Sequence, residues 1–262
     1  MLYAYAHSGL ADAGERAQTI LNEMLKGADD DSIAPDINSF NLVIKSWGKG
    51  KSNAFEHKAQ AVFDRVLQRP EVTLNDETFN AILSNWLKSK DNEALSLMIA
   101  LLETMEKLFN EGNLDAKPDR IAVNSVMSAL ARNGELQRVV QLQNRMEEVY
   151  DIAPDTVSNN ILVSAWSKSQ RSEAPERALE IFTQMEEGFK KGNQEVKPDN
   201  YSYTSVIDCF VKANRPQAGP QAMGLLERMQ AVHRDHGGDA PSTGCYNVVL
   251  NSLATARNKD SA

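Results

Sequence analysis

Six asparagine or threonine side chains recur in one local setting and could form hydrogen bonds with a ligand. Each stands in a short apolar segment such as Phe40-Asn41-Leu42-Val43-Ile44. An amide carries both a donor and an acceptor, so it can meet the pairing edge of a pyrimidine base. The structural alternative is that asparagine near a helix start satisfies free backbone groups. The six residues are Asn41, Asn80, Asn124, Asn160, Thr204 and Asn247.

A basic residue lies eight positions after each of the first five members of this row. On a helical wheel of about 100° per residue, that position lies on the flank of the asparagine face. A cation row in this register would follow the phosphates of a nucleic acid. The alternative is that each cation is favoured by the dipole at a helix C-terminus. The predicted phosphate contacts are Lys49, Lys88, Arg132, Lys168 and Lys212.

Residue types used in catalysis and metal binding show no recognised arrangement. The sequence contains no GxxxxGK[ST], no GxGxxG after a strand, no HExxH and no local signature of a nucleophilic serine or cysteine. His233 and His236 have a spacing that could hold a metal, but they stand beside Gly237-Gly238 in a predicted loop, which favours ordinary exposed histidines. The acidic run 29–31 is interpreted as a loop. We therefore expect no enzyme, catalytic residue, cofactor, metal or small-molecule substrate.

The bulk composition limits the function classes. The chain has 262 residues, of which 42% are hydrophobic, and its formal net charge is −8. This acidic balance disfavours strong non-specific RNA binding, but a groove responds mainly to charges within about 8 Å. No apolar run of about 18 residues predicts a membrane span. Cys209 and Cys245 have no CxxC spacing, which predicts reduced, half-buried thiols in an intracellular compartment.

A Pro-Asp pair, or a substitute for it, precedes each member of the asparagine row. Its second residue lies five positions before the asparagine or threonine. Proline ends one helix, and Asp, Asn or Ser caps the next. These residues are Asp36, Asn75, Asp119, Asp155, Asp199 and Ser242.

Each unit also contains a second amphipathic helix, such as the segment around Phe182 and Met185. One helical hairpin cannot bury its apolar face alone, so neighbouring hairpins must stack. A further apolar position, six after the asparagine, lies near 240° on the wheel and is predicted to pack between helices, with base stacking as the alternative. This position holds Tyr5, Trp47, Trp86, Leu130, Trp166, Phe210 and Leu253.

These signatures resemble the pentatricopeptide repeat family over essentially the whole chain. The residues that carry the resemblance are the aromatic-Asn opening, the Leu/Phe-x-x-Met second helix and the closing Pro-Asp. The predicted fold is all-α, a right-handed α-solenoid superhelix of tandem helix-turn-helix repeats, similar to tetratricopeptide arrays. The chain is expected to begin and end inside repeats, with no leader segment visible. The repeats span 37–75, 76–119, 120–155, 156–199 and 200–242, between partial repeats at 1–36 and 243–262.

The resemblance implies that the opening and closing residues of one repeat recognise one base together. In similar repeats Asn with Asp selects U, Asn with Asn selects C, and Thr with a small polar partner leans to a purine. Read from the N-terminal side, the chain would select C-U-U-U-purine. The pairs are Asn41 with Asn75, Asn80 with Asp119, Asn124 with Asp155, Asn160 with Asp199, and Thr204 with Ser242.

In similar repeats an aliphatic residue three positions before the asparagine clasps the base. Ile121, Val157 and Tyr201 fit this base sandwich, whereas Glu77 places an anion there and Gly244 offers no surface. The middle repeats are therefore expected to be the best binding units.

The expected function is single-stranded RNA binding in organellar RNA processing, stability or translation. The resemblance implies a mitochondrion or a plastid. The alternative is a solenoid scaffold that binds protein partners, which the low net basicity and Glu77 would favour.

Overall fold

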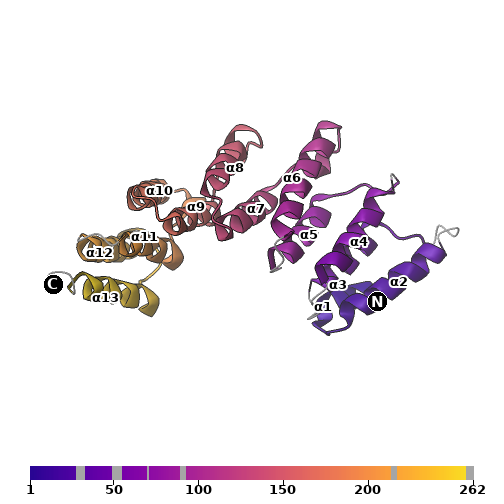
Figure 1. Ribbon diagram of the computed structural model, residues 1–262, viewed down its shortest axis with the longest axis horizontal. Coiled ribbons are helices and arrows are strands. Elements are labelled where there is room, and N and C mark those ends of the chain that lie inside the picture. The colour runs from indigo at the N-terminus through magenta and orange to yellow at the C-terminus, as the bar shows by residue number, and fades with distance from the viewer. Residues whose placement is uncertain (28–32, 49–54, 70, 89–92, 214–216, 258–262) are drawn as a thin grey trace. The chain divides into compact units, whose positions relative to one another are not determined.

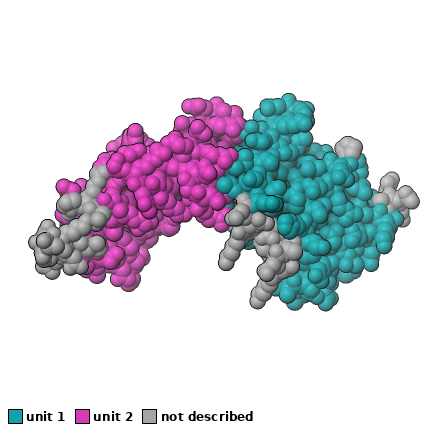
Figure 2. Space-filling view, in the orientation of Figure 1, with its two compact units in different colours: residues 1–126 teal, residues 127–262 magenta. Residues whose placement is uncertain are grey.

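The computed structural model describes residues 1–27, 33–48, 55–69, 71–88, 93–213 and 217–257. Within these residues the chain is all-α and has no strand, which confirms the predicted fold class. No helix among them is long and apolar enough to cross a bilayer. The chain divides into two compact units, residues 1–126 and 127–262, which are coloured separately in Figure 2.

The first unit is a row of helical hairpins (Figure 1). In each hairpin the helix that comes first in the chain is called the first helix. The first helices α1, α3 and α5 contact one another in succession, whereas the second helix α2 packs against α1 and α3, and the second helix α4 packs against α3 and α5. Helix α7 runs on into the second unit. The elements are α1 (Leu2–Ser8), α2 (Ala13–Lys26), α3 (Ile37–Trp47), α4 (Phe55–Leu67), α5 (Asp76–Lys88), α6 (Ala94–Asn110), the 3-10 helix η1 (Leu114–Ala116) and α7 (Arg120–Arg132).

The second unit repeats this plan. The first helices α9, α11 and α13 contact in succession, while α10 packs against α9 and α11, and α12 packs against α11 and α13. Within each unit, the first helices therefore form a layer, and this layer carries that unit's members of the asparagine row. The elements are α8 (Leu136–Glu148), α9 (Thr156–Ser169), α10 (Ala174–Lys190), the 3-10 helix η2 (Gln194–Val196), α11 (Asn200–Lys212), α12 (Ala218–His236) and α13 (Thr243–Arg257).

Aromatic residues near the ends of the first helices pack between helices, as predicted. Trp47 is 5% exposed, and its indole Nε1 lies 3.4 Å from the Gln18 side-chain oxygen on α2. Trp86, Leu130 and Phe210 are also buried. Burial leaves the rings of Trp47, Trp86 and Phe210 no face on which a base could stack, whereas Tyr5, Trp166 and Leu253 of the predicted set are only half-buried.

A polar cluster ties three helices of the second unit together. The carboxylate of buried Glu186 on α10 accepts a hydrogen bond from the Tyr203 hydroxyl at 3.0 Å and from Arg228 Nη2 at 2.6 Å. The Arg228 guanidinium also lies 5.3 Å from the centre of the Phe182 ring. Burial, reinforced by the neighbouring Glu186, raises the pKa of Tyr203 and keeps its hydroxyl a donor.

The prediction of a loop around His233 and His236 was wrong. Both residues lie in the last turn of α12, which ends at Gly237 with a left-handed φ of 70°. Basic side chains are favoured at a helix C-terminus, and glycine is favoured at the left-handed position after it. The two histidines therefore form the end of the helix, and the helix stops only at Gly237. His233 Nδ1 lies 2.7 Å from the Gly238 carbonyl oxygen, and no three potential metal ligands cluster among the described residues. The acidic run 29–31 lies outside them.

Two helical glycines give opposite predictions for replacement by alanine. A Cβ on Gly14 would lie 2.4 Å from the Trp47 ring, whereas a Cβ on Gly224 would meet nothing within 4 Å. Alanine normally stabilises a helix interior by about 0.5–1 kcal/mol relative to glycine. Thermal melting should therefore show Gly224→Ala at or above the wild-type midpoint and Gly14→Ala below it. Equal shifts in the same direction would contradict the packing of Trp47 on α2.

Candidate nucleic-acid interface

The residue that closes each repeat caps the first helix of the next. The Asp199 carboxylate accepts from the Ser202 backbone N–H at 2.8 Å, and the two residues form a reciprocal capping box. Asn75 and Asp119 accept in the same way from the N–H groups of Thr78 at 3.1 Å and Ala122 at 2.7 Å. The chain folds this way locally because these side chains satisfy N–H groups that a helix start leaves free.

The same closing side chains accept a second hydrogen bond, from the asparagine of their own repeat. The Asn80 Nδ2 group donates to Asp119 at 2.8 Å. Equivalent bonds join Asn41 to Asn75 at 3.3 Å and Asn160 to Asp199 at 3.2 Å. The structure thus brings together three of the five predicted pairs, 34 to 39 residues apart along the chain.

The amide oxygens of these three asparagines are left without a hydrogen bond. Asn41, Asn80 and Asn160 each have a buried Oδ1 that has no partner among the described residues. An unsatisfied buried acceptor costs about 1–3 kcal/mol. The structural alternative, in which asparagine satisfies free backbone groups of its own helix, does not describe these amides, because each donates to the closing residue.

The predicted pair of Thr204 with Ser242 differs from these three pairs. The Thr204 hydroxyl donates to backbone carbonyls of its own helix, those of Asn200 at 2.9 Å and Tyr201 at 3.1 Å. Ser242 Oγ accepts from the Cys245 N–H at 3.4 Å, so neither hydroxyl engages the other. Asn124 lies in the first unit and Asp155 in the second, where Asp155 caps α9 through Ser158. Asn247, on α13, is exposed.

The predicted sandwich residues are large, apolar and exposed. Ile121 is 62% exposed, and Val157 and Tyr201 are each 54% exposed. Each lies near the start of its helix, one turn before the recurring asparagine or threonine. In the first repeats this position differs, because Asn38 is polar and Glu77 forms an ion pair with Lys45 on the preceding first helix. The apolar surface at this register therefore belongs to repeats 120–155, 156–199 and 200–242.

The described members of the cation row are all exposed, but some of them already form a hydrogen bond or an ion pair within the protein. Arg132 and Lys168 form no hydrogen bond or ion pair with any residue that the structure describes. Lys88 Nζ lies 3.4 Å from the Gly48 carbonyl oxygen, at the end of α3, as the helix-dipole alternative expects. Lys212 is in an ion pair with Asp208 at 2.6 Å. Lys49 lies outside the described residues.

The carboxyl of Asp36, which caps α3, has its pKa shifted by opposing effects. Burial raises the pKa, but hydrogen bonds from the Ser39 hydroxyl and N–H and from Asn38 outweigh burial and lower it below its ordinary value. A lowered pKa in the folded state means that the charged cap stabilises the fold above the ordinary pKa. This contribution is lost as pH falls through the lowered value.

The cysteines offer no reactive thiol at this surface. Cys209 and Cys245 are both free and buried. Burial raises the pKa of the Cys209 thiol to about 12, so it stays protonated at neutral pH.

Sequence reasoning missed the 3-10 turn that precedes two of the closing aspartates. Gly112 and Gly192 both adopt left-handed φ values, of 103° and 101°, ahead of η1 and η2. The Thr156 hydroxyl at the start of α9 then donates to the carbonyls of Glu195 at 3.0 Å and Lys197 at 2.8 Å, two residues before Asp199. The available signal was the pattern Gly-Asn followed by Lys-Pro-Asp, which occurs twice, 80 residues apart.

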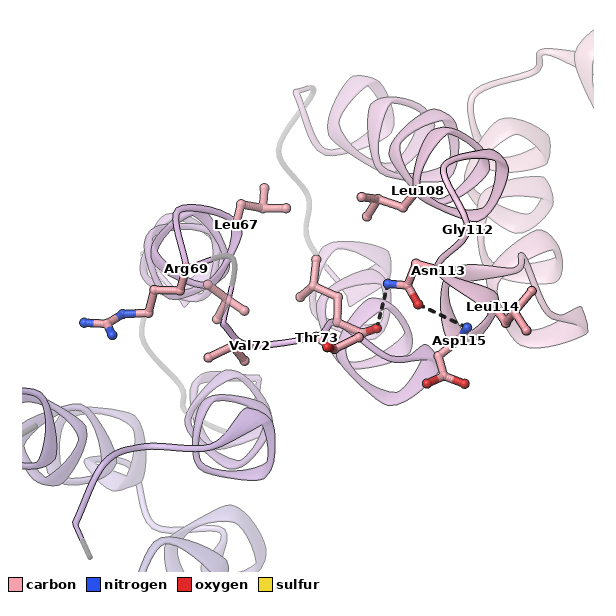
Figure 3. Close-up of a pocket in the computed structure, with 11 residues that line it drawn as sticks. Leu67, Arg69, Val72, Thr73, Leu108, Gly112, Asn113, Leu114 and Asp115 are labelled. Carbon is pink, nitrogen blue, oxygen red and sulfur yellow. Dashed lines mark hydrogen bonds between the residues drawn. The ribbon is translucent and has the colours of Figure 1, made fainter. Parts of the chain in front are cut away.

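A cleft of about 570 Å³ lies beside η1 in the first unit. Figure 3 shows the two hydrogen bonds of Asn113 there, to the Leu74 carbonyl at 3.1 Å and from the Asp115 N–H at 3.2 Å. Leu67, Leu108 and Leu114 are among its lining residues. None of the predicted base or phosphate contacts lines it, so this cleft is separate from the candidate interface.

Comparison with known proteins identifies the repeats. The family model for the pentatricopeptide repeat domain matches residues 107–169, and the model for a single repeat of this type matches residues 201–231. Residues 107–169 and 201–231 therefore match pentatricopeptide repeats. This confirms the resemblance carried by the aromatic-Asn and Pro-Asp signatures.

Similar proteins occur in Arabidopsis thaliana. One pentatricopeptide repeat-containing protein is 22% identical over 196 residues, covering 74% of this chain and 29% of the relative. Another, described as mitochondrial, is 23% identical over 251 residues, covering 82% of this chain and 31% of the relative. The chain thus spans less than a third of the length of these relatives.

Solved structures share the fold. The crystal structure of the pentatricopeptide repeat protein PPR10 from maize has a TM-score of 0.52 at 20% identity, covering 97% of this chain and 37% of that one. PPR10 in complex with an 18-nt psaJ RNA element gives a TM-score of 0.50 at 20% identity, covering 97% of this chain and 36% of that one.

Two replacements of Asp199 separate its capping role from its charge. Asp199→Ala removes both the helix cap and the acceptor for Asn160, and should cost about 1–2 kcal/mol of unfolding free energy. Asp199→Asn keeps an acceptor oxygen and an equally good cap, so its stability should stay within about 0.5 kcal/mol of wild type. Denaturant unfolding measures both, and a loss for Asp199→Asn as large as for Asp199→Ala would contradict the double role.

Proposed function

We propose that this chain binds single-stranded RNA along its first helices, with one base at each repeat. The observation that carries the proposal is the repeated geometry of Asn41, Asn80 and Asn160. In each repeat the asparagine amide donates a hydrogen bond to the closing residue at the same register, so the two polar side chains are held together. The structural similarity to PPR10, which has been crystallised with RNA, supports the proposal.

The closing residue supplies a chemical basis for base choice. A carboxylate only accepts hydrogen bonds, whereas an amide both donates and accepts. Uracil presents an N3–H donor on its pairing edge, which suits Asp119 and Asp199. Cytosine presents an acceptor at N3 and an amino donor, which suits the amide of Asn75. Together with Asn124 and Asp155, these residues give the series C-U-U-U.

The fifth pair, Thr204 with Ser242, gives the weak purine preference of the series. The exposed side chains of Ile121, Val157 and Tyr201 supply flat or branched apolar surface against which bases can be clasped.

Phosphate binding is assigned to the first four members of the cation row, on the flank of the same helices. Lys88, Arg132 and Lys168 are exposed and face no carboxylate in the described structure, and Lys49 stands at the same register in the sequence. Cations at this spacing neutralise the backbone without selecting sequence. The formal net charge of −8 then keeps non-specific affinity low.

The wider role proposed is in organellar RNA processing, stability or translation. A relative described as mitochondrial supports an organelle, and a mitochondrion or a plastid is the proposed location. The repeats would shield or mark a transcript, and protein partners would supply any chemistry on it.

Fluorescence anisotropy with labelled C-U-U-U-A RNA tests the proposal directly. Binding should be stronger than to poly-A of equal length, because the closing aspartates favour uracil. Three to four phosphate contacts predict a log–log salt slope of about −2 to −3, from about 0.7 per contact on single strands. Absence of binding to either RNA at low salt would contradict RNA binding and favour a protein-binding scaffold. Binding without salt dependence would contradict the cation row.

A further inference from the structure

Repeat 200–242 differs from the repeats before it in how its cation is held. Lys212 Nζ lies 2.6 Å from the Asp208 carboxylate, one helical turn earlier on α11. The same carboxylate accepts from the Ser167 hydroxyl at 2.7 Å, and Lys212 also lies 3.3 Å from that hydroxyl. Ser167 is on α9 and is only 5% exposed. The ion pair is therefore anchored to the neighbouring repeat.

The matching position in the preceding repeats carries no acid. Four residues after the recurring asparagine stand Ser84, Ser128 and Ser164, where repeat 200–242 has Asp208 after Thr204. Ser84 donates to the Ala81 carbonyl of its own helix. Lys88 and Lys168, one turn later, therefore have no carboxylate beside them on the helix.

The base-recognition pair of repeat 200–242 is also not joined. The Thr204 hydroxyl is used by the carbonyls of Asn200 and Tyr201, and the Ser242 hydroxyl by Cys245. Asn160 and Asp199, in the repeat before, do form their bond. Two separate observations thus distinguish repeat 200–242 from its neighbour.

We propose that Asp208 ends the RNA track: it holds Lys212 in an internal ion pair, so that repeat 200–242 binds no phosphate. An incoming phosphate would have to displace a carboxylate held by both Lys212 and Ser167, and the carboxylate repels it. The pair has the favourable order of an acid four residues before a base on a helix. This inference rests on the proposed RNA binding and adds to it a limit on the footprint.

Replacing Asp208 with the serine found in the three preceding repeats should free Lys212. Asp208→Ser should steepen the log–log salt slope for labelled C-U-U-U-A-A-A RNA by about 0.7, the value for one added phosphate contact. At 0.1 M salt this corresponds to binding about five-fold tighter than wild type. Asp208→Asn keeps the size of the side chain and an acceptor for Ser167, and it should give the same change in salt slope. It serves as the test variant if Asp208→Ser folds poorly.

A matched control separates this local effect from a general loss of negative charge. Glu180 on α10 is an exposed acid paired with Arg177 at 2.9 Å, and Glu180→Gln removes one negative charge from the same unit. Its salt slope should equal that of wild type. Lys212→Met should change wild-type binding little, but it should abolish the gain when combined with Asp208→Ser.

The outcomes distinguish the two proposals. If wild type binds RNA and both Asp208 variants behave like Glu180→Gln, Asp208 does not end the track and the inference fails while RNA binding stands. A gain that persists in Asp208→Ser with Lys212→Met would also overturn it, because Lys212 would not be the group released. If no variant binds RNA at low salt, the proposed function itself fails and the inference falls with it.

Discussion

The hydrogen bond from a recurring asparagine to the residue that closes its repeat is the interaction on which the array depends. Asn75, Asp119 and Asp199 each accept this bond and also cap the helix that follows. One closing side chain therefore caps the first helix of one repeat and also binds the asparagine on the first helix of the preceding repeat. A residue placed by two such contacts can present a defined hydrogen-bonding edge, because its geometry does not depend on the ligand.

The local parts of this arrangement could be predicted from the sequence. Pro-Asp followed five residues later by asparagine specifies a helix stop, a cap and a side chain one turn further on, all within one short segment. The burial of Trp47 and Trp86 also follows from helical periodicity. The end of α12 was misjudged because Gly237-Gly238 indicates where a helix stops without excluding His233 and His236 from its last turn.

Contacts between neighbouring repeats could not be predicted in this way. Lys45 and Glu77 lie 32 residues apart, and Ser167 lies 41 residues before Asp208. Such contacts depend on how closely adjacent first helices approach, which the pattern within one repeat does not determine. They are also what makes the repeats unequal, because an ion pair removes a cation that the sequence alone would count as available.

The central claim is that each pair of opening and closing residues recognises one base. Its most direct test is to change two closing residues and to measure how many nucleotides separate the RNA positions whose base preference changes. Asp119→Asn and Asp199→Asn replace the closing residues of repeats 76–119 and 156–199, which are two repeats apart. Selection from a random RNA pool should show U replaced by C at one position for each variant, two nucleotides apart, with the Asp119 change nearer the 5′ end. A change at the same nucleotide in both variants, or a loss of affinity with unaltered base preference, would contradict the account.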